Sequence, residues 1–596
     1  MGIFKIKPLE VISPFATQLV GLGNSNLNPD EQRLLQLAID YLLTQLDNGH
    51  SCVKIDRLSK ALPVSTDELH TLLQKSDLVG ELTQVTNSNI HNKPLSVVAI
   101  PGQQSLIYIT RYLHYELQIS KYLSKLVTPL NIDAKFQHQA EDLLLQLSKQ
   151  KHGLPNEQQH LAILNSLKQQ FSIITGAPGT GKTTTVILLL YILYQYYGGS
   201  LKVKICAPTG KAAARVKESI QNSLEMFSAH GIDIKQQVFT KLIETSSNFG
   251  TIHKLLGARP NQIYFKHDQT NPLDAEVLII DESSMIGLPL FSKLIQAINP
   301  TRTKHIILLG DKNQLSSVEE GYVFASLVNY FLKIKSQVVI ELTESKRNIG
   351  DIGKLANYIL GNQIDAALET LQTADNTKLV GCSFKPLLFQ TCYGSDPYSY
   401  TNYIAFIKQH QHRQEIDTNY RQELFKHYMQ FIVLCLSNNG LFGTTYQNLQ
   451  IEKHIKLQLN TNNLWYPGRP IIINKNDQAL DLYNGDIGIC QLLNDKLVVI
   501  FNNGTIYVPE ILPPHKLAYA ITIHKAQGSE FDSVAIVLSD DGAATATDNL
   551  LVKELVYTAV TRAKNNAIIY SGREKLKFAL GNHTLRESGL EYFLHQ

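Results

Sequence analysis

The feature that most constrains the fold of this chain is a glycine-rich loop at residues 176–183, GAPGTGKT. It follows an apolar run, FSIIT (171–175), of the length expected for a buried strand, and it precedes an apolar segment (186–197) expected to be a buried helix. Strand, loop and helix in this order are typical of a phosphate-binding loop, in which backbone N–H groups close around phosphate oxygens. The chain is therefore expected to contain a parallel α/β sheet that binds a nucleotide.

The loop supplies most of the residues expected to hold that nucleotide. Its glycines allow the backbone to converge on phosphate oxygens, and the dipole of the following helix adds to the attraction. Lys182 is expected to reach the β- and γ-phosphates, and Thr183 to bind Mg²⁺. The predicted nucleotide-binding residues of the loop are Gly176, Ala177, Pro178, Gly179, Thr180, Gly181, Lys182, Thr183 and Thr184.

A second apolar run, VLII (277–280), ends at an acidic pair further along the chain. Asp281 is expected to hold Mg²⁺ through its water shell, and Glu282 to polarise the attacking water as a general base. An acidic strand end alone is a common feature. Beside a phosphate loop, however, it favours a site for ATP hydrolysis.

A third apolar run (306–309) ends at Gly310 and leads into polar residues that include Gln314. Open α/β sheets bind their ligands at the carboxyl ends of the strands. An uncharged amide at this position can hydrogen-bond the γ-phosphate and lose that bond on hydrolysis. Gln314 is therefore predicted to sense the nucleotide state and pass it to a neighbouring site.

Length and periodicity indicate several domains, because 596 residues exceed what one hydrophobic core organises. Residues 1–150 carry helix-start signals and are expected to form a helical docking domain. Short apolar runs alternate with amphipathic segments over 151–365 and again over 366–596, which predicts an α/β fold with two doubly wound parallel sheets. Turn-rich β sequence near 465–515 is interpreted as an inserted small barrel.

Composition excludes some classes of protein. A formal net charge of +3 is too small to attract nucleic acid by bulk charge, so a nucleic-acid site would need a basic groove. Six cysteines without a CxxC pattern indicate buried thiols in a reducing cytosol rather than a zinc site. The N-terminal stretch lacks an apolar core of signal-peptide length, and the segment 186–197 is too short to span a bilayer. A cytoplasmic protein is expected.

The segment TGKAAARVK (209–217) carries the clearest physical signal for nucleic acid. Lys211 and Arg215 lie four residues apart and therefore share a helix face, while Thr209 and Gly210 lie at the helix start. A solvated basic helix would show the same pattern. We interpret these four residues as contacts to the phosphates of single-stranded DNA.

Taken in order, these motifs resemble those of superfamily 1 DNA helicases, and in particular the RecD family, the alpha subunits of exodeoxyribonuclease V. The resemblance covers roughly residues 150–596, and a whole series of motifs is more specific than any one of them. The motifs read NEQQHLA (156–162), GAPGTGKTTT (176–185), APTGKAAARVKES (207–219), TIHKLLG (251–257), LIIDESSM (278–285), LLGDKNQLSSVEEG (308–321), LTESKR (342–347), WYPGRPIIINKND (465–477), LYNGDIGI (482–489), AYAITIHKAQGSEFDSV (518–534) and VYTAVTRAK (556–564).

The resemblance implies two RecA-like domains with ATP between them, the second carrying an SH3-like β insertion. It implies that Gln159 reads the adenine edge. Arg347 and Arg562 would reach the γ-phosphate from the second domain as arginine fingers. Gly528 and Glu530 would line the same cleft, with Glu530 near the ribose.

The resemblance also implies further contacts to single-stranded DNA in both sheet domains. Trp465 is a stacking candidate, although a position in the core is the more expected reading. The implied DNA contacts are Thr251 and His253 in the first domain and Thr522, His524 and Lys525 in the second.

By the same resemblance, the activity would be an ATP- and Mg²⁺-dependent 5′–3′ helicase acting on single-stranded DNA and duplex ends. We find no nuclease constellation beyond the residues assigned to ATP, so the nuclease would lie on the RecB subunit of a bacterial RecBCD complex. The N-terminal domain would then dock on RecC. The segment 258–273 could form a hairpin that parts the duplex.

Two other functions stay open on the sequence alone. One is a phosphate-loop ATPase that acts as a DNA-linked switch or loader without unwinding, in which case single-stranded DNA would not stimulate ATP turnover. The other is a structural subunit with a vestigial site. The joint presence of the key site residues disfavours the second alternative; they are Lys182, Thr183, Asp281, Glu282, Gln314, Arg347 and Arg562.

Overall fold

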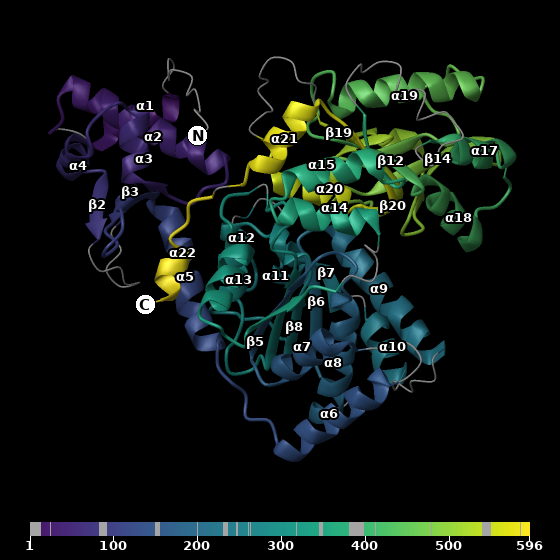
Figure 1. Ribbon diagram of the computed structural model, residues 1–596, viewed down its shortest axis with the longest axis horizontal. Coiled ribbons are helices and arrows are strands. Elements are labelled where there is room, and N and C mark those ends of the chain that lie inside the picture. The colour runs from purple at the N-terminus through teal and green to yellow at the C-terminus, as the bar shows by residue number, and fades with distance from the viewer. Residues whose placement is uncertain are drawn as a thin grey trace.

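A computed structural model shows the N-terminal domain (purple) beside two α/β lobes that lie against each other (Figure 1). The structure describes residues 13–23, 26–82, 92–149, 155–198, 201–229, 236–245, 248–259, 262, 264–317, 319–344, 350–380, 399–411, 413–477, 479–538, 550–584 and 586–595.

The first lobe is built on a six-stranded parallel sheet with the order β10-β5-β9-β8-β6-β7. Alternate residues of the central strands enter two separate hydrophobic clusters, so both faces of the sheet are covered, as parallel sheets require. The strands are β5 (Phe171–Gly176), β6 (Val203–Ala207), β7 (Phe249–Thr251), β8 (Val277–Ile280), β9 (His305–Gly310) and β10 (Val339–Leu342).

Helices cover the two faces of this sheet in two groups. One face carries α5 (Thr110–Leu126), α11 (Ile252–Leu256), α12 (Leu288–Gln296) and α13 (Val323–Lys333). The other carries α6 (Ala134–Ser148), α7 (Glu157–Leu167), α8 (Lys182–Tyr197), α9 (Gly210–Ala229) and α10 (Gln236–Glu244).

The second lobe contains a five-stranded parallel sheet with the order β11-β20-β19-β12-β18. The two predicted doubly wound parallel sheets are therefore confirmed. The strands are β11 (Thr377–Val380), β12 (Phe431–Cys435), β18 (Ala520–Thr522), β19 (Phe531–Val537) and β20 (Ala563–Tyr570). The helices are α14 (Asp351–Leu360), α15 (Ile364–Thr373), α17 (Thr401–Gln409), α18 (Thr418–Tyr428), α19 (Thr444–Gln458), α20 (Lys553–Val560) and α21 (Arg573–Gly581).

The boundary between the lobes lies before α14. This helix falls in the range predicted for the first lobe, but Ile352, Leu355 and Ile359 on its buried face belong to the hydrophobic core of the second lobe. The chain therefore crosses between the lobes after β10.

A five-stranded antiparallel sheet is inserted in the second lobe, with the order β16-β15-β14-β13-β17. The predicted β-rich insertion is present. Its closure into a barrel is not confirmed, because no described pairing joins the edge strands β16 and β17. The strands are β13 (Pro470–Ile473), β14 (Ile487–Leu493), β15 (Lys496–Phe501), β16 (Ile506–Tyr507) and β17 (His515–Leu517).

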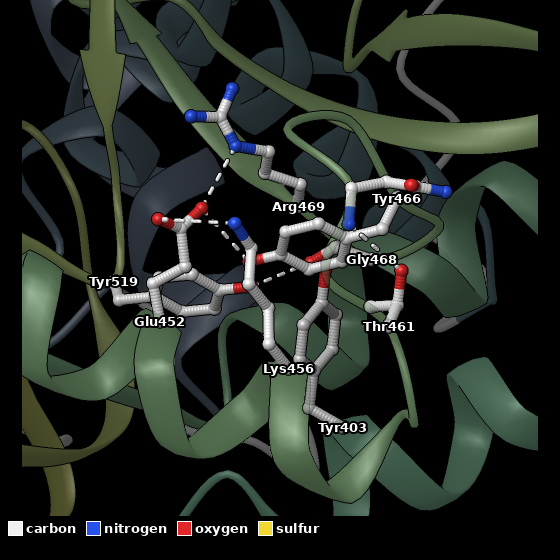
Figure 2. A network of polar contacts seen from close by, with 9 residues as sticks. Tyr403, Glu452, Lys456, Thr461, Tyr466, Gly468, Arg469 and Tyr519 are labelled. Carbon is white, nitrogen blue, oxygen red and sulfur yellow. Dashed lines mark hydrogen bonds and ion pairs between the residues drawn. The ribbon is translucent and has the colours of Figure 1, made fainter.

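A buried polar network fixes this inserted sheet to the lobe, and we call it the Glu452 anchor (Glu452, Tyr466, Gly468, Arg469 and Tyr519; Figure 2). Glu452 of α19 accepts from Arg469 Nε at 3.0 Å and from the Tyr466 hydroxyl at 3.2 Å. The hydroxyls of Tyr466 and Tyr519 lie 3.0 Å apart, and Tyr519 donates to the Gly468 carbonyl at 3.2 Å. Since Arg469 directly precedes β13, the network holds the start of the inserted sheet.

The N-terminal domain is helical, as predicted, but it also contains a four-stranded sheet of order β1-β4-β3-β2 that the sequence pattern does not predict. The strands are two to four residues long, too short to show a clear apolar alternation. The elements are α1 (Pro14–Gly23), α2 (Pro29–Asp47), β1 (Val53–Lys54), α3 (Ile55–Ala61), α4 (Thr66–Lys75), β2 (Val79–Leu82), β3 (Leu95–Val98) and β4 (Leu106–Ile109).

The C-terminal segment, residues 586–595, leaves the second lobe and runs back to the N-terminal domain and the first lobe (Figure 1, yellow). Its short helix α22 (Leu590–Leu594) packs beside α5. The Tyr330 hydroxyl donates to the Leu594 carbonyl at 2.8 Å, and Ser120 donates to the Phe593 carbonyl at 2.7 Å. This segment ties three parts of the molecule together.

Two further predictions concern membrane-spanning helices and the state of the cysteines. Among the described residues, no helix has the length and apolar character needed to cross a membrane. The four cysteines that the structure describes are buried free thiols, as predicted for scattered core cysteines; they are Cys52, Cys206, Cys435 and Cys490.

Candidate nucleotide and nucleic-acid site

The phosphate loop lies between β5 and α8, at the carboxyl edge of the first sheet. Gly179 and Gly181 have φ angles of +80° and +83°, a conformation that residues with side chains adopt rarely. Lys182 Nζ donates to the carbonyls of Gly176 at 2.7 Å and Ala177 at 3.0 Å. The lysine therefore folds over its own loop, beside the backbone N–H groups expected to bind phosphate, and Thr183 and Thr184 follow in the first turn of α8.

Gln159 of α7 lies directly against this loop and is buried. Its Nε2 donates to the Thr180 carbonyl at 3.2 Å, and its Oε1 accepts from the Asn156 N–H at 3.0 Å. The amide is thus engaged on both sides in this conformation. Its predicted role in reading the adenine edge stays a prediction.

Asp281 and Glu282 follow β8, next to the loop. The Glu282 N–H donates to Asp281 Oδ1 at 2.8 Å, and Glu282 itself has a φ of +50°. A left-handed residue other than glycine costs about 1–3 kcal/mol and is found preferentially at functional sites. Burial and the neighbouring Glu282 carboxylate raise the pKa of Asp281, in that order, so its charged form is disfavoured without a cation.

Gln314 lies at the end of β9, as predicted, but its first partner is an acid that the sequence analysis did not select. Asp311 is buried and accepts from Gln314 Nε2 at 3.2 Å and from the Tyr557 hydroxyl of the second lobe at 3.0 Å. Burial raises the pKa of Asp311, while Lys182 opposes that rise. The sequence feature that could have identified Asp311 is its position directly after the strand β9.

The residue after Gln314 joins the lobes. The Leu315 N–H donates to Thr558 Oγ1 at 2.8 Å, and the Leu315 carbonyl accepts from Gln527 Nε2 at 2.8 Å. The Leu315 side chain belongs to the core of the second lobe. The segment that follows Gln314 is therefore bonded directly to α20 and to the turn after β18.

Arg562 reaches the cleft from the second lobe, between α20 and β20, and only 2% of it is exposed. Its Nε donates to the Thr558 carbonyl at 3.1 Å and its Nη1 to the Ser529 carbonyl at 3.3 Å. Its Nη2 has no hydrogen-bond partner among the described residues. Burial lowers the pKa of Arg562, against the attraction of carboxylates that include Glu282 of the first lobe.

The other predicted arginine finger, Arg347, lies in 345–349, outside the described residues. The preceding residues Thr343 and Glu344 contact the start of α7, because the Thr343 N–H donates to Gln158 Oε1 at 2.7 Å and Asn156 Nδ2 donates to Glu344 Oε2 at 2.8 Å. Thr343 and Glu344, the last described residues before Arg347, thus lie beside the start of α7.

Three residues predicted for two different ligands are bound to one another across the cleft. Arg215 of α9, predicted to contact DNA, donates to the Gly528 carbonyl at 2.5 Å and forms an ion pair with Glu530 at 2.6 Å. Gly528 has a φ of +68°, and a methyl group on it would lie 3.8 Å from Glu282 Oε1. In this conformation Arg215 closes the lobes, and its DNA contact stays a prediction.

The three threonines predicted to contact DNA share one local geometry. Thr209, Thr251 and Thr522 each precede a helical turn, and each hydroxyl oxygen accepts from a backbone N–H three residues later, at 3.2, 3.1 and 3.4 Å. Capping uses a lone pair of the oxygen and leaves the O–H donor available. A phosphate oxygen needs such a donor.

The basic residues beside these turns differ in their surroundings. Lys211 Nζ is buried and has no hydrogen-bond partner among the described residues, and burial together with Arg215 lowers its pKa to about 8. Lys525 Nζ donates to Asn474 Oδ1 at 2.5 Å, and burial lowers the pKa of Lys525 as well. Burial also lowers the pKa of His524, and partial desolvation lowers that of the exposed His253.

Two further predictions concern Trp465 as a stacking residue and the segment 258–273 as a hairpin. Trp465 packs partly buried against the core of the inserted sheet, and the Arg469 guanidinium lies 4.6 Å from its ring, which favours the core reading. The segment 258–273 includes residues 260, 261 and 263, which lie outside the described residues. Its described part contains a turn in which Asp268 accepts from the Asn271 N–H at 3.0 Å.

The chemistry of the cleft fits a nucleotide with a divalent cation. In the part of the chain that the structure describes, no group of three or more acidic, His or Cys side chains could hold a metal by itself. Mg²⁺ bound to phosphates needs only one or two protein ligands and keeps its waters. The Asp281 carboxylate and the Thr183 hydroxyl suit that role, while Lys182 and the unpartnered Nη2 of Arg562 suit the phosphates.

Comparisons with known proteins agree with this chemistry. Residues 159–320 match the AAA domain family, and residues 517–570 match the UvrD-like helicase C-terminal domain family. The chain is 35% identical to the RecBCD enzyme subunit RecD of Haemophilus influenzae, over 72% of this chain and 71% of that protein. It is 32% identical to the RecBCD enzyme subunit RecD of Mycolicibacterium smegmatis, over 74% of this chain and 75% of that protein.

A more distant relative and a solved structure extend the comparison. The chain is 26% identical to the ATP-dependent RecD2 DNA helicase of Deinococcus radiodurans, over 94% of this chain and 69% of that protein. The crystal structure of a Pif1 helicase from Bacteroides in complex with ADP-AlF3 and single-stranded DNA has a TM-score of 0.36 to this chain. That structure is 17% identical, over 74% of this chain and 92% of its own.

Proposed function

Because the chain belongs to the RecD family of RecBCD enzyme subunits, we propose that it is the motor of such an enzyme and moves 5′ to 3′ along single-stranded DNA. As a member of this family it is an ATP-hydrolysing superfamily 1 DNA helicase. The direction of movement, the partner subunits and the role of each residue are proposals.

One observation carries the proposal, namely the position of Arg562. This arginine comes from the second lobe, lies buried within the electrostatic reach of Glu282 and Asp311 of the first lobe, and keeps Nη2 without a partner among the described residues. A buried donor left unpaired costs about 1–3 kcal/mol. A γ-phosphate supplies the missing acceptor, so a nucleotide held by the first lobe would draw the second lobe towards it.

The steps of hydrolysis follow from the side chains around the loop. Lys182 exchanges its loop carbonyls for the β- and γ-phosphate oxygens, and Glu282 accepts a proton from the attacking water. Arg562 stabilises the charge that develops on the γ-phosphate, together with Arg347. Gln314 exchanges its bond to Asp311 for one to the γ-phosphate and regains it when phosphate leaves.

Thr183 and Asp281 are the residues that would hold Mg²⁺. The ion, when bound, neutralises charge on the β- and γ-phosphates. The raised pKa of Asp281 fits this role, because a buried carboxylate that lacks a cation is unstable in its charged form.

The DNA strand is proposed to cross both lobes along the three capped turns. The free O–H donors of Thr209, Thr251 and Thr522 face phosphates, and the neighbouring basic side chains neutralise them. Since Leu315 links the Gln314 segment to the second lobe, nucleotide loss changes the separation of the grips and advances the enzyme. The proposed grips further include Gly210, Lys211, His253, His524 and Lys525.

The partner subunits are proposed to be RecB and RecC, with the N-terminal domain docked on RecC. Helix α1 supports this, because Phe15 and Leu22 are 55% and 84% exposed and lie seven residues apart, on one helix face. A double Phe15→Ser, Leu22→Ser variant should lose co-purification with RecC and keep DNA-stimulated ATP hydrolysis. Phe578→Ser, at a 50% exposed position on α21, is the matched control. Undiminished co-purification of the double variant would exclude this face of α1.

The motor function is tested by strand displacement on duplexes that carry either a 5′ or a 3′ overhang, with and without ATP. We expect displacement of the 5′-tailed duplex only, and only with ATP. Displacement confined to 3′-tailed duplexes would reverse the polarity. If single-stranded DNA stimulates no turnover and neither duplex opens, the protein is a switch or loader instead.

A further inference from the structure

Arg586 lies at the start of the C-terminal segment, more than two hundred residues in sequence from the loop that it contacts. This loop, residues 316–321, connects Gln314 and Leu315 to α13, and all of its residues except 318 are described. Arg586 Nη2 donates to the Ser317 carbonyl at 2.8 Å, and Nη1 donates to the carbonyls of Gly321 at 3.0 Å and Glu319 at 3.3 Å. One guanidinium thus grips both ends of the loop.

These contacts go to the backbone rather than to a carboxylate. In the described ranges no ion pair holds Arg586, and burial lowers its pKa. A planar guanidinium with donors in fixed directions determines the spacing of the carbonyls it binds, which a lysine ammonium does not. The contacts of Arg586, together with those of Ser317 Oγ to the Glu319 and Gly321 carbonyls, therefore constrain the spacing of Ser317, Glu319 and Gly321.

The loop has its own connections at both ends. At its start, Leu315 bonds to Thr558 and Gln527 of the second lobe. At its end, the Gly321 N–H donates to the Gly49 carbonyl of the N-terminal domain at 3.0 Å, and Gly321 has a φ of +91°. The loop is consequently held between the second lobe and the N-terminal domain, with Arg586 across it.

The positive charge of Arg586 also reaches the proposed DNA grip of the second lobe. It contributes to the lowered pKa of His524, after the larger effect of burial. His524 follows Thr522, whose hydroxyl caps the same turn. Arg586 therefore contacts the loop that begins beside the nucleotide sensor and lies within electrostatic reach of a residue proposed to touch the DNA strand.

We propose that Arg586 is a positioning residue that holds the 316–321 loop in the conformation through which strand binding at the second lobe accelerates ATP hydrolysis at Gln314. The inference rests on the proposed motor function and adds to it the element that couples the two ligands. It assigns no chemistry to Arg586 itself, which touches neither substrate. Without Arg586, single-stranded DNA and ATP both bind, but the bound DNA no longer accelerates ATP turnover.

The same segment offers a matched control, because its contacts with α5 use different atoms. The buried Glu116 carboxylate accepts from Ser588 Oγ at 2.6 Å, from the Gly589 N–H at 3.2 Å and from Ser51 Oγ at 2.6 Å. A Ser588→Ala variant weakens these contacts and leaves the three carbonyl contacts of Arg586 intact. It separates docking of the segment from shaping of the loop.

The test measures ATP turnover by the full chain with and without saturating oligo(dT), for wild type, Arg586→Gln, Arg586→Lys and Ser588→Ala. We expect the stimulation ratio of Arg586→Gln to fall by about tenfold or more, in the usual range for coupling between two sites. The KM for ATP and the oligo(dT) affinity should stay near wild type. Arg586→Lys should recover part of the ratio and Ser588→Ala should keep it.

The outcomes are distinguishable. A wild-type ratio in Arg586→Gln overturns the inference, and so does an equal loss in Ser588→Ala, which would make docking alone responsible. A weakened affinity for ATP or oligo(dT) that accounts for the whole effect also overturns it. If Arg586→Gln does not fold, Arg586→Lys decides, since a lysine that retains the full ratio is incompatible with a guanidinium-specific role. Absence of any stimulation in wild type refutes the motor function instead.

Discussion

The nucleotide cleft and the Glu452 anchor both bury charged side chains, but they treat them in opposite ways. In the anchor, Glu452 and Arg469 are 8% and 9% exposed; Arg469 donates to Glu452, and Glu452 also accepts from the Tyr466 hydroxyl (Figure 2). In the ligand sites, Arg562 Nη2 of the nucleotide cleft and Lys211 Nζ of the adjoining DNA grip are buried without partners among the described residues. The anchor is complete as the chain folds, whereas the cleft lacks the acceptors that its donors require.

This difference distinguishes side chains that stabilise the fold from side chains that are positioned to bind ligands. An unpaired buried charge destabilises the folded chain, and it persists only where another requirement outweighs that cost. The positive φ of Glu282 and the raised pKa values of Asp281 and Asp311 follow the same pattern. Substitutions in the cleft should therefore lower activity at little or no cost in stability, and substitutions in the anchor should do the reverse.

The largest expected effect is on turnover, from Lys182→Gln. Loss of the ammonium removes the charge that meets the β- and γ-phosphates, and we expect DNA-stimulated ATP hydrolysis to fall to background. The folded chain should be unaffected, because among the described residues Lys182 donates to carbonyls of its own loop alone. Turnover assays combined with thermal denaturation check both halves, and undiminished turnover would refute the site.

Arg562→Ala should lower kcat by about a thousandfold, the lower range for an arginine finger. Its midpoint of thermal unfolding should stay equal to that of wild type or rise, since the variant removes a buried charge with an unpaired N–H. Steady-state kinetics and calorimetry provide the two measurements. A destabilised variant with near-normal kcat would show that Arg562 stabilises the fold, as the anchor residues do, and does not act on the nucleotide.

Arg469→Met should act mainly on stability. Removing Arg469 leaves Glu452 with the longer contact to Lys456 Nζ at 3.9 Å, so the free energy of unfolding should fall by about 3 kcal/mol, the lower end of the range for a broken buried ion pair. Adding Glu452→Gln should recover part of that loss, and chemical denaturation of the single and double variants measures it. Additive losses in the double variant would mean that the two side chains are not coupled, contrary to the anchor as described.

Lys211→Met should give the smallest effect and the opposite sign. Because burial lowers the pKa of Lys211 to about 8, protonation of this lysine opposes folding at neutral pH. The variant should be more stable than wild type by roughly 1–3 kcal/mol at pH 7. Wild type regains this stability as pH rises from 8 towards the pKa of an unfolded lysine, about 10.4, so the difference should vanish there.

Denaturation of both proteins at pH 7, 9 and 10.5 follows this change, with the exposed Lys254→Met as control. The Lys211→Met variant should also bind single-stranded DNA more weakly than wild type at pH 7, which fluorescence anisotropy measures. A lower stability of Lys211→Met than of wild type at pH 7 would show that Lys211 is paired in solution. Lys211 would then resemble the paired charges of the anchor.

The residues that the sequence identified well are those whose geometry depends on near neighbours. Gly181 at +83° and the start of α8 follow from a strand, a glycine-rich loop and a helix in immediate succession. Gln314 at the end of β9 follows in the same way from an apolar run that stops at Gly310. Such features are decided by dihedral preferences and hydrogen bonds within a few residues.

Other features needed the tertiary structure, because they join residues far apart in the chain. Arg215 pairs with Glu530, and Asp311 binds Tyr557, only because two sheets face each other in one orientation. Arg586 is bound to the 316–321 loop only because the C-terminal segment turns back to the first lobe. Local sequence determines which groups stand at the strand ends, whereas the packing of the lobes decides which of those groups find partners and which stay open for a ligand.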